Sequence, residues 1–214
     1  MKIVIVGEGG HSKVITDLIT SQTEAQIVGY LDDKYQETII RDKQFFGPLS
    51  TIEKLREAFY DIKYIVAIGN NRRRKHLVQM LNLPIDYYAT LQHKSAIVSP
   101  SSTIGYGTVI MANTVINADS QIGNHTIINT GSIVEHDNQV ADFVHISPQA
   151  ALTGSVILEE GVHIGAGATV IPNVRIGEWS IIGAGATVIN HIPAYSTAVG
   201  TPAKVKNKLA IEGD

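Results

Sequence analysis

The sequence predicts an α/β domain followed by a parallel β-helix built from six-residue repeats. Three observations support this fold class: a ladder of aliphatic residues at a spacing of six, a column of small residues two positions before it, and an alternation of strands and helices in the N-terminal third. We place the boundary between residues 94 and 95, so that residues 1–94 form the α/β domain and residues 95–214 form the β-helix with its C-terminal tail.

The aliphatic ladder determines the fold of the second domain. Every sixth residue from Val98 to Val188 is Ile, Val or Leu without exception. Neither the 3.6-residue period of a helix nor the two-residue period of a strand gives this pattern, whereas hexapeptide β-helices repeat in this way. The small-residue column, from Ala96 to Ala186, holds only Ala, Ser, Thr or Val, except at Asn138. Each repeat therefore directs one bulky and one small side chain inward.

Three hexapeptides close one triangular coil, so equivalent residues of successive coils are eighteen residues apart and stack about 4.8 Å from each other. The ladder is long enough for about five coils, a prism about 25 Å tall. Glycines follow several ladder residues directly, where we expect a turn that benefits from the absence of Cβ; they are Gly105, Gly123, Gly165, Gly177 and Gly183.

The N-terminal third alternates apolar strands with amphipathic helices. We expect strands over residues 2–6, 27–31 and 64–68, helices over 11–21, 50–59 and 72–81, and a short strand over 87–91; Ser50 to Glu53 resembles a capping box. Such alternation favours a parallel sheet with right-handed crossovers. About 90 residues provide only one mononucleotide-binding half of a Rossmann-like fold, which argues against a complete NAD dehydrogenase.

Polar and glycine-rich segments follow three of these strands. Parallel sheets bind ligands outside the carboxyl ends of their strands, and glycine turns before a helix are suited to phosphate groups. The first turn departs from the dinucleotide motif because Ser12 replaces its third glycine. The alternative is a set of solvated turns without a ligand. We favour a ligand site formed by Gly9, Gly10, His11, Asp32, Asp33, Gly69 and Asn70.

Composition narrows the class of protein further. The net charge is −3 and no basic stripe with aromatic residues is present, so nucleic acid is not an expected partner. The absence of cysteine excludes disulfides, thiolate metal sites and a cysteine acyl-enzyme. The N-terminal apolar run is too short for a signal peptide, and no stretch is long enough to span a membrane. We therefore expect a cytoplasmic protein.

The strongest candidate for catalysis is His136. It lies two residues after the ladder residue Val134, which makes it point outward, and it stands between Glu135 and Asp137. A carboxylate beside an imidazole fixes its tautomer and raises its basicity, as a general base near neutral pH requires. Asn138 follows two positions later, and departures from a local rule are expected at functional sites. The alternative is a solvated surface histidine.

Two further histidines, His145 and His163, are eighteen residues apart and should stack on one face of the β-helix. A zinc site on stacked histidines is the alternative chemistry, because some β-helix proteins are metal-dependent carbonic anhydrases. Those use three histidines, two of them five residues apart, and no pair within these repeats has that spacing. We therefore predict no metal.

The repeats, the Glu135-His136-Asp137 segment and the tail Val199-Gly200-Thr201-Pro202-Ala203-Lys204 resemble hexapeptide-repeat acyltransferases. The opening Ile5-Val6-Gly7-Glu8-Gly9-Gly10-His11, together with Leu31-Asp32-Asp33, narrows the resemblance to two-domain nucleotide-sugar acetyltransferases. This group includes bacterial UDP-4-amino-sugar N-acetyltransferases of bacillosamine synthesis, perosamine N-acetyltransferases and relatives that O-acetylate sialic acid. The resemblance covers nearly the whole chain.

The resemblance implies a left-handed β-helix, a homotrimer, acetyl-CoA as co-substrate in the groove between adjacent prisms, and a nucleotide-linked amino sugar as acceptor. By position, His136 matches the general base, with Glu135 or Asp137 as its orienting carboxylate. Asn129 matches a polar residue near the sugar and His145 one near the thioester, while Gly9, Gly10, His11, Asp32 and Asp33 match the nucleotide-sugar pocket. Further candidates for contacts with the cofactor are Gly154, Gly165, Gly183 and Lys204.

We expect direct transfer in a ternary complex, with backbone N–H groups near Gly154 stabilising the oxyanion. Two alternatives remain open at this point. The same scaffold could acetylate a hydroxyl group, as in sialic acid decoration, or a trimeric β-helix could bind a nucleotide sugar without catalysis.

Overall fold

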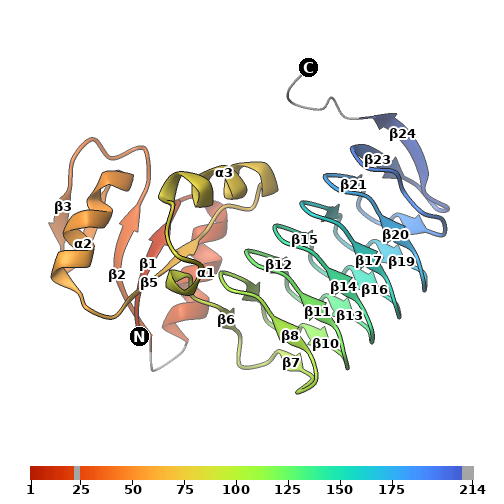
Figure 1. Cartoon of the computed structure of the whole chain (residues 1–214), viewed down its shortest axis with the longest axis horizontal. Coiled ribbons are helices and arrows are strands. Elements are labelled where there is room, and N and C mark those ends of the chain that lie inside the picture. Colours follow the sequence, from red (N-terminus) through yellow and green to blue (C-terminus); the bar gives the residue numbers. More distant parts are fainter. Residues whose placement is uncertain (22–24, 209–214) are drawn as a thin grey trace. The chain divides into compact units, whose positions relative to one another are not determined.

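The computed structural model describes residues 1–21 and 25–208, and the chain divides into two compact units, Met1–Leu91 and Gln92–Asp214 (Figure 1). This division lies three residues before the boundary expected from the sequence, between residues 94 and 95. It falls within β6 (Leu91–Gln92), which is the edge strand of a β-helix sheet, next to β9.

The first unit is built on a five-stranded sheet with the order β3-β4-β2-β1-β5. Parallel pairs join β1 to β2, β1 to β5 and β2 to β4, whereas β3 runs antiparallel to β4. The strands are β1 (Lys2–Val6), β2 (Gln26–Leu31), β3 (Ile39–Arg41), β4 (Gln44–Gly47) and β5 (Ile62–Val66). The helices are α1 (Gly10–Thr20), α2 (Ile52–Ala58) and α3 (Asn71–Leu81), with short 3₁₀ turns at Leu49–Thr51 and Ile85–Tyr87.

Both faces of this sheet are buried. Val4 and Val6 pack in one core with Leu55 of α2 and Leu81 of α3. Side chains alternate along a strand, so the neighbouring residues of β1 point to the opposite face, where Ile5 is also fully buried. A strand buried on both faces reads as a continuous apolar run, which is why β1 was recognisable in the sequence.

Three local predictions for this unit were wrong. The hairpin of β3 and β4 lies in a segment expected to be a loop. The capping box is not formed, because residues Leu49–Thr51 make a 3₁₀ turn and the N-cap of α2, Thr51, makes no side-chain capping bond. The strand expected over 87–91 is reduced to an isolated bridge between Tyr64 and Tyr88 and the two residues of β6.

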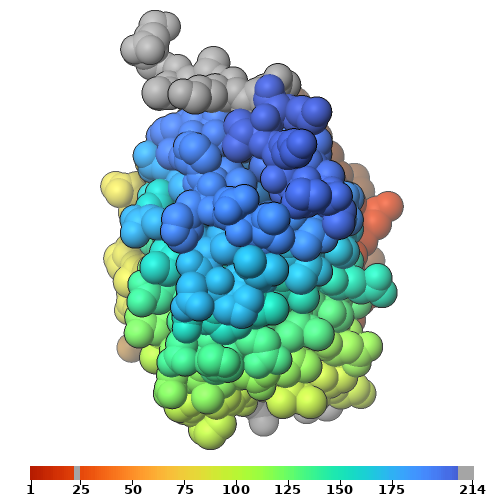
Figure 2. Space-filling view, turned by 90° about the vertical axis from the view of Figure 1, so that its right-hand side faces the viewer, coloured from red at the N-terminus to blue at the C-terminus, as the bar shows by residue number. Residues whose placement is uncertain are grey.

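The second unit is the predicted parallel β-helix, formed by hexapeptide repeats. Each strand from β7 to β19 pairs in parallel with the strand three further along the chain, and the paired residues are eighteen apart, as with Ile116 and Val134. At the end of the described chain β21 pairs in parallel with β23, and β23 pairs antiparallel with β24. Three sheets result, with the orders β22-β19-β16-β13-β10-β7, β20-β17-β14-β11-β8 and β24-β23-β21-β18-β15-β12-β9-β6. The coils succeed one another from green to blue in Figure 1, and Figure 2 shows them as stacked bands.

The repeat strands have two residues each: β7 (Ile97–Val98), β8 (Thr103–Ile104), β9 (Val109–Ile110), β10 (Val115–Ile116), β11 (Gln121–Ile122), β12 (Ile127–Ile128), β13 (Ile133–Val134), β14 (Gln139–Val140), β15 (His145–Ile146), β16 (Ala151–Leu152), β17 (Ile157–Leu158), β18 (His163–Ile164), β19 (Thr169–Val170), β20 (Arg175–Ile176), β21 (Ile181–Ile182) and β22 (Thr187–Val188). Two longer strands, β23 (Ser196–Val199) and β24 (Lys204–Lys208), end the described part of the chain.

The core of the β-helix consists of the two predicted columns. Ladder residues from Ile110 to Val188 are buried, and the polar members of the small-residue column, such as Thr108, Ser120 and Asn138, are fully buried beside them. The first ladder residues, Val98 and Ile104, are only partly buried, because they belong to the first coil and have neighbours on one side.

The turn glycines are needed because they lack Cβ, as predicted, and the structure shows that the reason is close packing between coils. None of Gly105, Gly123, Gly165, Gly177 and Gly183 has a left-handed φ; that conformation occurs at other turn residues, such as Asp119 and Asp137. A Cβ on Gly165 would instead lie 2.5 Å from the backbone nitrogen of Ala184. At four of these positions a side chain would collide with the backbone of the next coil, so the close stacking of coils requires the glycines.

Candidate active site

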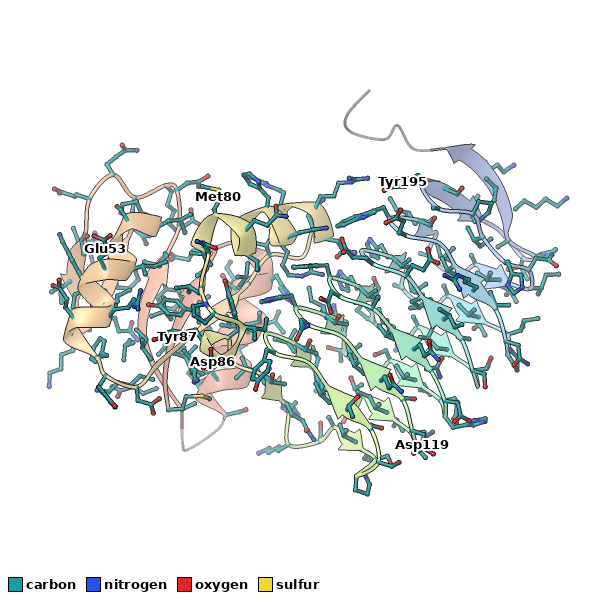
Figure 3. All side chains as sticks on the ribbon, viewed as in Figure 1. Glu53, Met80, Asp86, Tyr87, Asp119 and Tyr195 are labelled. Carbon is teal, nitrogen blue, oxygen red and sulfur yellow. The ribbon has the colours of Figure 1, made fainter. Side chains whose placement is uncertain are left out.

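His136 projects from a turn of the β-helix between β13 and β14, and its side chain is 59% exposed. The next residue, Asp137, adopts a left-handed conformation (φ 59°), which directs its carboxylate back towards the ring. Asp137 Oδ2 lies 2.7 Å from His136 Nδ1. Asp119 occupies the equivalent turn of the preceding coil, and Figure 3 shows it at the outer edge of the β-helix.

Of the two carboxylates that the sequence left open, Glu135 and Asp137, it is Asp137 that forms a hydrogen bond with His136. The hydrogen bond to Asp137 is the main cause that raises the pKa of His136 above the ordinary value. Burial opposes this effect, and the negative charges of Asp137 and Glu135 add to it. With Nδ1–H donated to the carboxylate, the lone pair of the neutral imidazole resides on Nε2. This nitrogen is free to accept a proton.

Gly154 lies one coil further on, at the position equivalent to His136. A Cβ on Gly154 would be 2.6 Å from His136 Cε1 and 2.7 Å from Nε2, so the imidazole rests against the Gly154 backbone. The Gly154 N–H has no acceptor among the residues that the structure describes. The reactive edge of the imidazole and an unused backbone donor thus lie next to each other.

The neighbouring sheet face carries the predicted histidine stack. The rings of His145 and His163 are parallel, with centroids 4.9 Å apart. Asn129 Nδ2 lies 3.2 Å from His145 Nε2, and Ser147 Oγ lies 2.9 Å from His163 Nε2. Asn129 and His145, which were both predicted to contact substrates, are therefore in direct contact with each other.

Candidate cofactor residues further along the β-helix are more scattered. Gly165 and Gly183 are one coil apart and are explained by coil stacking: the Gly183 Cβ would meet Val199 Cγ1 at 2.7 Å. Lys204 is exposed at the start of β24. Among the described residues, none of these three contacts His136, so their proposed contacts with the cofactor remain predictions.

A cavity of about 470 Å³ opens at the carboxyl edge of the sheet in the first unit. Its apolar wall comes from β1, β2, the segment after β5 and α3, and includes Leu31, Ile68 and Met80; Met80 is marked on α3 in Figure 3. Its polar lining is Glu8, Gly9, Asp32, Asp33, Arg73 and His76. The structure thus brings together Gly9, Asp32 and Asp33, as predicted from their places after two adjacent strands.

Asp32 organises the edge of this cavity. Its Oδ2 accepts the Glu8 N–H at 2.6 Å and its Oδ1 accepts the Lys34 N–H at 3.1 Å. Burial favours the neutral acid, but these hydrogen bonds outweigh it and hold the pKa of Asp32 below its ordinary value. Because both oxygens are already engaged, Asp33 is the carboxylate with more capacity for a ligand.

Gly10, His11, Gly69 and Asn70 do not line the cavity. Asn70 caps α3, accepting the Arg73 N–H at 3.0 Å, and the Gly69 carbonyl accepts a hydrogen bond from buried Arg74. His11 Nε2 is buried without a hydrogen-bond partner among the described residues. Burial, with a smaller effect of the Arg74 charge, lowers the pKa of His11 to about 4.

Sequence reasoning missed Arg73 and His76. Both lie on α3, within a run of basic residues directly after the Gly69-Asn70 segment that was selected. This run of basic residues was the signal for a binding surface in the sequence, but the prediction for it was limited to a helix.

No group of three or more His, Asp or Glu side chains suited to a metal ion occurs within the described ranges. In the same part of the chain, no helix has the length and apolar character needed to cross a membrane.

These features define a two-domain hexapeptide-repeat transferase. Residues 2–81 match the model of the PglD N-terminal domain, and residues 155–190 match that of the bacterial transferase hexapeptide, with six repeats. The chain belongs to the PglD-type family of hexapeptide-repeat acetyltransferases, as two relatives that match it over nearly its whole length show.

Perosamine N-acetyltransferase from Caulobacter crescentus, solved with CoA and GDP-perosamine, is 36% identical, with 97% of each chain covered and a TM-score of 0.87. The acetyltransferase domain of PglB from Neisseria gonorrhoeae, solved with acetyl coenzyme A, is 34% identical over 96% of this chain and 98% of that one, with a TM-score of 0.85. UDP-N-acetylbacillosamine N-acetyltransferase from Bacillus subtilis is 48% identical over 110 residues; this match spans about half of either chain, 51% of each.

Proposed function

We propose that this protein transfers the acetyl group of acetyl-CoA to the amino group of a nucleotide-linked 4-amino sugar, with His136 as the general base. The observation that carries the proposal is the arrangement of His136: Nδ1 is held by Asp137 at 2.7 Å, and the opposite edge of the ring rests on the Gly154 backbone. The named activities of the Caulobacter and Bacillus relatives support the same reaction class.

In the proposed reaction, the sugar amine attacks the thioester carbonyl carbon while His136 Nε2 takes a proton from the nitrogen. The Gly154 N–H donates to the oxygen that becomes negatively charged in the tetrahedral intermediate, an interaction that is strongest when the site excludes water. The carbon–sulfur bond then breaks, and the imidazolium returns the proton to the leaving thiolate. Asp137 stabilises the imidazolium between these two steps.

The nucleotide is proposed to bind in the cavity of the first unit. The apolar wall around Leu31, Ile68 and Met80 suits a base, and Asp33 can accept hydrogen bonds from it. Arg73 and His76 supply donors for the diphosphate. The buried, unpartnered Nε2 of His11 is a further candidate to contact the substrate.

The exposure of His136 supports the proposed homotrimer. With 59% of its side chain accessible, the base needs a second surface to cover it before water is excluded from the reaction. A neighbouring β-helix would provide that surface, and acetyl-CoA would lie in the groove between the two. Acetyl-CoA as donor is consistent with a cytoplasmic location, which we also propose.

The test is to supply acetyl-CoA with a panel of UDP- and GDP-linked 4-amino sugars, with free sialic acid as a hydroxyl acceptor, and to follow release of the CoA thiol. His136→Ala should lower kcat by about 10²-fold or more, as expected for loss of a general base. His191→Ala is the matched control, since His191 is an exposed histidine of the same β-helix whose Nδ1 only accepts the Arg175 N–H.

Transfer to sialic acid alone would replace the amine acceptor by a hydroxyl. Full turnover by His136→Ala would remove His136 from the mechanism, and absence of thiol release with every acceptor would favour a non-catalytic binding protein.

A further inference from the structure

Asn138 is the single residue in the small-residue column outside the set Ala, Ser, Thr and Val, and it is fully buried inside the β-helix. It is two residues after His136. The residues at the equivalent position in the other coils are Ser102, Ser120, Val156 and Val174.

Most serines and threonines of the column follow one hydrogen-bonding pattern. From Ser102 to Thr126, each hydroxyl donates to a carbonyl fifteen residues later, as Ser120 Oγ does to Glu135 O at 2.7 Å and Thr108 Oγ1 to Gly123 O at 2.8 Å. Thr108 Oγ1 and Ser120 Oγ also accept the backbone N–H eighteen residues later, that of Thr126 at 3.0 Å and that of Asn138 at 3.3 Å. Ser132 Oγ departs from the pattern and donates to Asn129 O, three residues earlier, at 2.7 Å. The bonds of Thr108 and Ser120 join each coil to the next one.

Asn138 makes this pair of bonds and two more. Its Nδ2 donates to Thr153 O at 3.0 Å, and its Oδ1 accepts the Val156 N–H at 3.1 Å. The same Nδ2 also lies 2.5 Å from Glu135 O and 3.3 Å from His136 O. The additional acceptors are the carbonyls on either side of the His136 Cα, and the amide has two hydrogens for these bonds and the bond to Thr153 O, whereas a hydroxyl has only one hydrogen to donate.

These bonds fix both peptide units that flank His136. Glu135 O accepts from Asn138 and also from Ser120 Oγ. His136 O accepts from Asn138 and from the Ser155 N–H at 3.0 Å, and the N–H of the same peptide unit, that of Asp137, donates to Ala118 O at 3.0 Å. Hydrogen bonds in the interior of the β-helix therefore fix the orientation of the His136 Cα–Cβ bond.

The bond to Thr153 O acts on the other side of the site. The carbonyl of Thr153 and the N–H of Gly154 belong to one planar trans peptide unit, in which they point in opposite directions. Because the carbonyl is bonded to Asn138 in the interior, the Gly154 N–H points away from the interior. This is the donor that lies beside the imidazole.

We propose that Asn138 is a positioning residue, which sets the general base and the oxyanion donor relative to each other through one buried amide. The inference rests on the proposed function, since it assigns a reason for the geometry of that same site. The amide touches neither substrate. Its contribution is to kcat, through the distance between two groups that act in the same step, one on the sugar nitrogen and one on the carbonyl oxygen.

Asn138→Ser tests this directly, because serine occupies the equivalent position at Ser102 and Ser120 and keeps the bond to the following coil. The variant lacks the second donor that reaches Glu135 O and His136 O. We expect kcat to fall about 10- to 100-fold, the range for misplacement of catalytic groups by up to 1 Å. KM for both substrates should stay within about twofold, and the acid limb of the pH profile should not move, since the pair of His136 and Asp137 is intact.

Thr108→Val is the matched control, because it removes the two interior bonds of Thr108 from a turn that carries no catalytic candidate. It should cost stability without lowering kcat. A readout independent of activity is the exchange of the Asp137 and Ser155 amide hydrogens, which should be about tenfold faster or more in Asn138→Ser and unchanged in Thr108→Val.

A kcat for Asn138→Ser equal to that of the wild type or of Thr108→Val would overturn the inference. If the wild-type protein releases no CoA with any acceptor, the proposed function fails on its own account. The exchange rates then decide the positioning role: acceleration at Asp137 and Ser155 supports it, and unchanged rates refute it.

Discussion

The contact between Gly154 and His136 allows activity and stability to be separated by two glycine substitutions. In Gly154→Ala, the new Cβ would lie 2.6 Å from His136 Cε1 and 2.7 Å from Nε2. Ordinary van der Waals contact begins at about 3.5 Å, so the ring has to move by about 1 Å. The backbone of Gly154 is not in the left-handed region, and the obstructing atoms belong to an exposed side chain that can rotate away.

The magnitude follows from this displacement. A shift of about 1 Å would stretch the 2.7 Å bond between His136 Nδ1 and Asp137 Oδ2 beyond hydrogen-bond range. It would also move Nε2 relative to the Gly154 N–H. A misplacement of this size costs about 10²-fold in rate, or about 2.7 kcal/mol of transition-state stabilisation. We therefore expect kcat for CoA release to fall about 100-fold, with little change in the melting temperature.

Gly131→Ala is the matched control. Gly131 has a φ of 67°, and its Cβ would make only an ordinary contact, 3.6 Å from Gln149 Cγ. The substitution should destabilise the protein by about 1–2 kcal/mol through left-handed strain and leave kcat unchanged. Steady-state kinetics and thermal unfolding of both variants provide the measurement. If Gly154→Ala retains full kcat, the imidazole does not act from the position that the structure shows.

Two further predictions concern titration. In Asp137→Asn, the hydrogen bond that raises the pKa of His136 is lost. The acid limb of kcat/KM should therefore move to lower pH, and the plateau rate should fall. An acid limb that stays in place in the pH–rate profile would show that Asp137 does not hold the base. His11 has its pKa lowered to about 4, so the unfolded state binds the proton first as the pH falls below about 6.5. Stability should therefore decrease between about pH 6.5 and pH 4 by up to about 3 kcal/mol, and denaturant unfolding of His11→Gln should lack this component.

The β-helix was predictable from the sequence because every repeat places an aliphatic residue at the same spacing of six. Each ladder residue must fill the interior of the prism, so an error in the spacing of six would expose a bulky side chain. The hairpin of β3 and β4 was not predictable for the opposite reason: its strands have three and four residues, and Ile40 is exposed, so no burial pattern marks them.

The candidate site was predictable in part. The outward direction of His136 follows from its distance to Val134, and the stacking of His145 on His163 follows from their separation of eighteen residues. The choice of Asp137 over Glu135 did not follow, because it depends on a left-handed φ at Asp137. The spacing places Gly154 at the position equivalent to His136, but the contact between the ring and Gly154 depends on a side-chain rotamer. The burial of His11 beside Arg74 depends on packing between α1 and the segment before α3.

The stacking of His136 on Gly154 means that the proposed chemistry is divided between two consecutive coils. The imidazole belongs to one and the backbone donor beneath it to the next, eighteen residues later. Exchanging a single coil between related enzymes would separate the imidazole from the backbone donor that lies against it, even though the strand register would stay the same. The smallest segment that can be transplanted as a working unit is a pair of adjacent coils, which limits how recombination among such proteins can create new acceptor specificities.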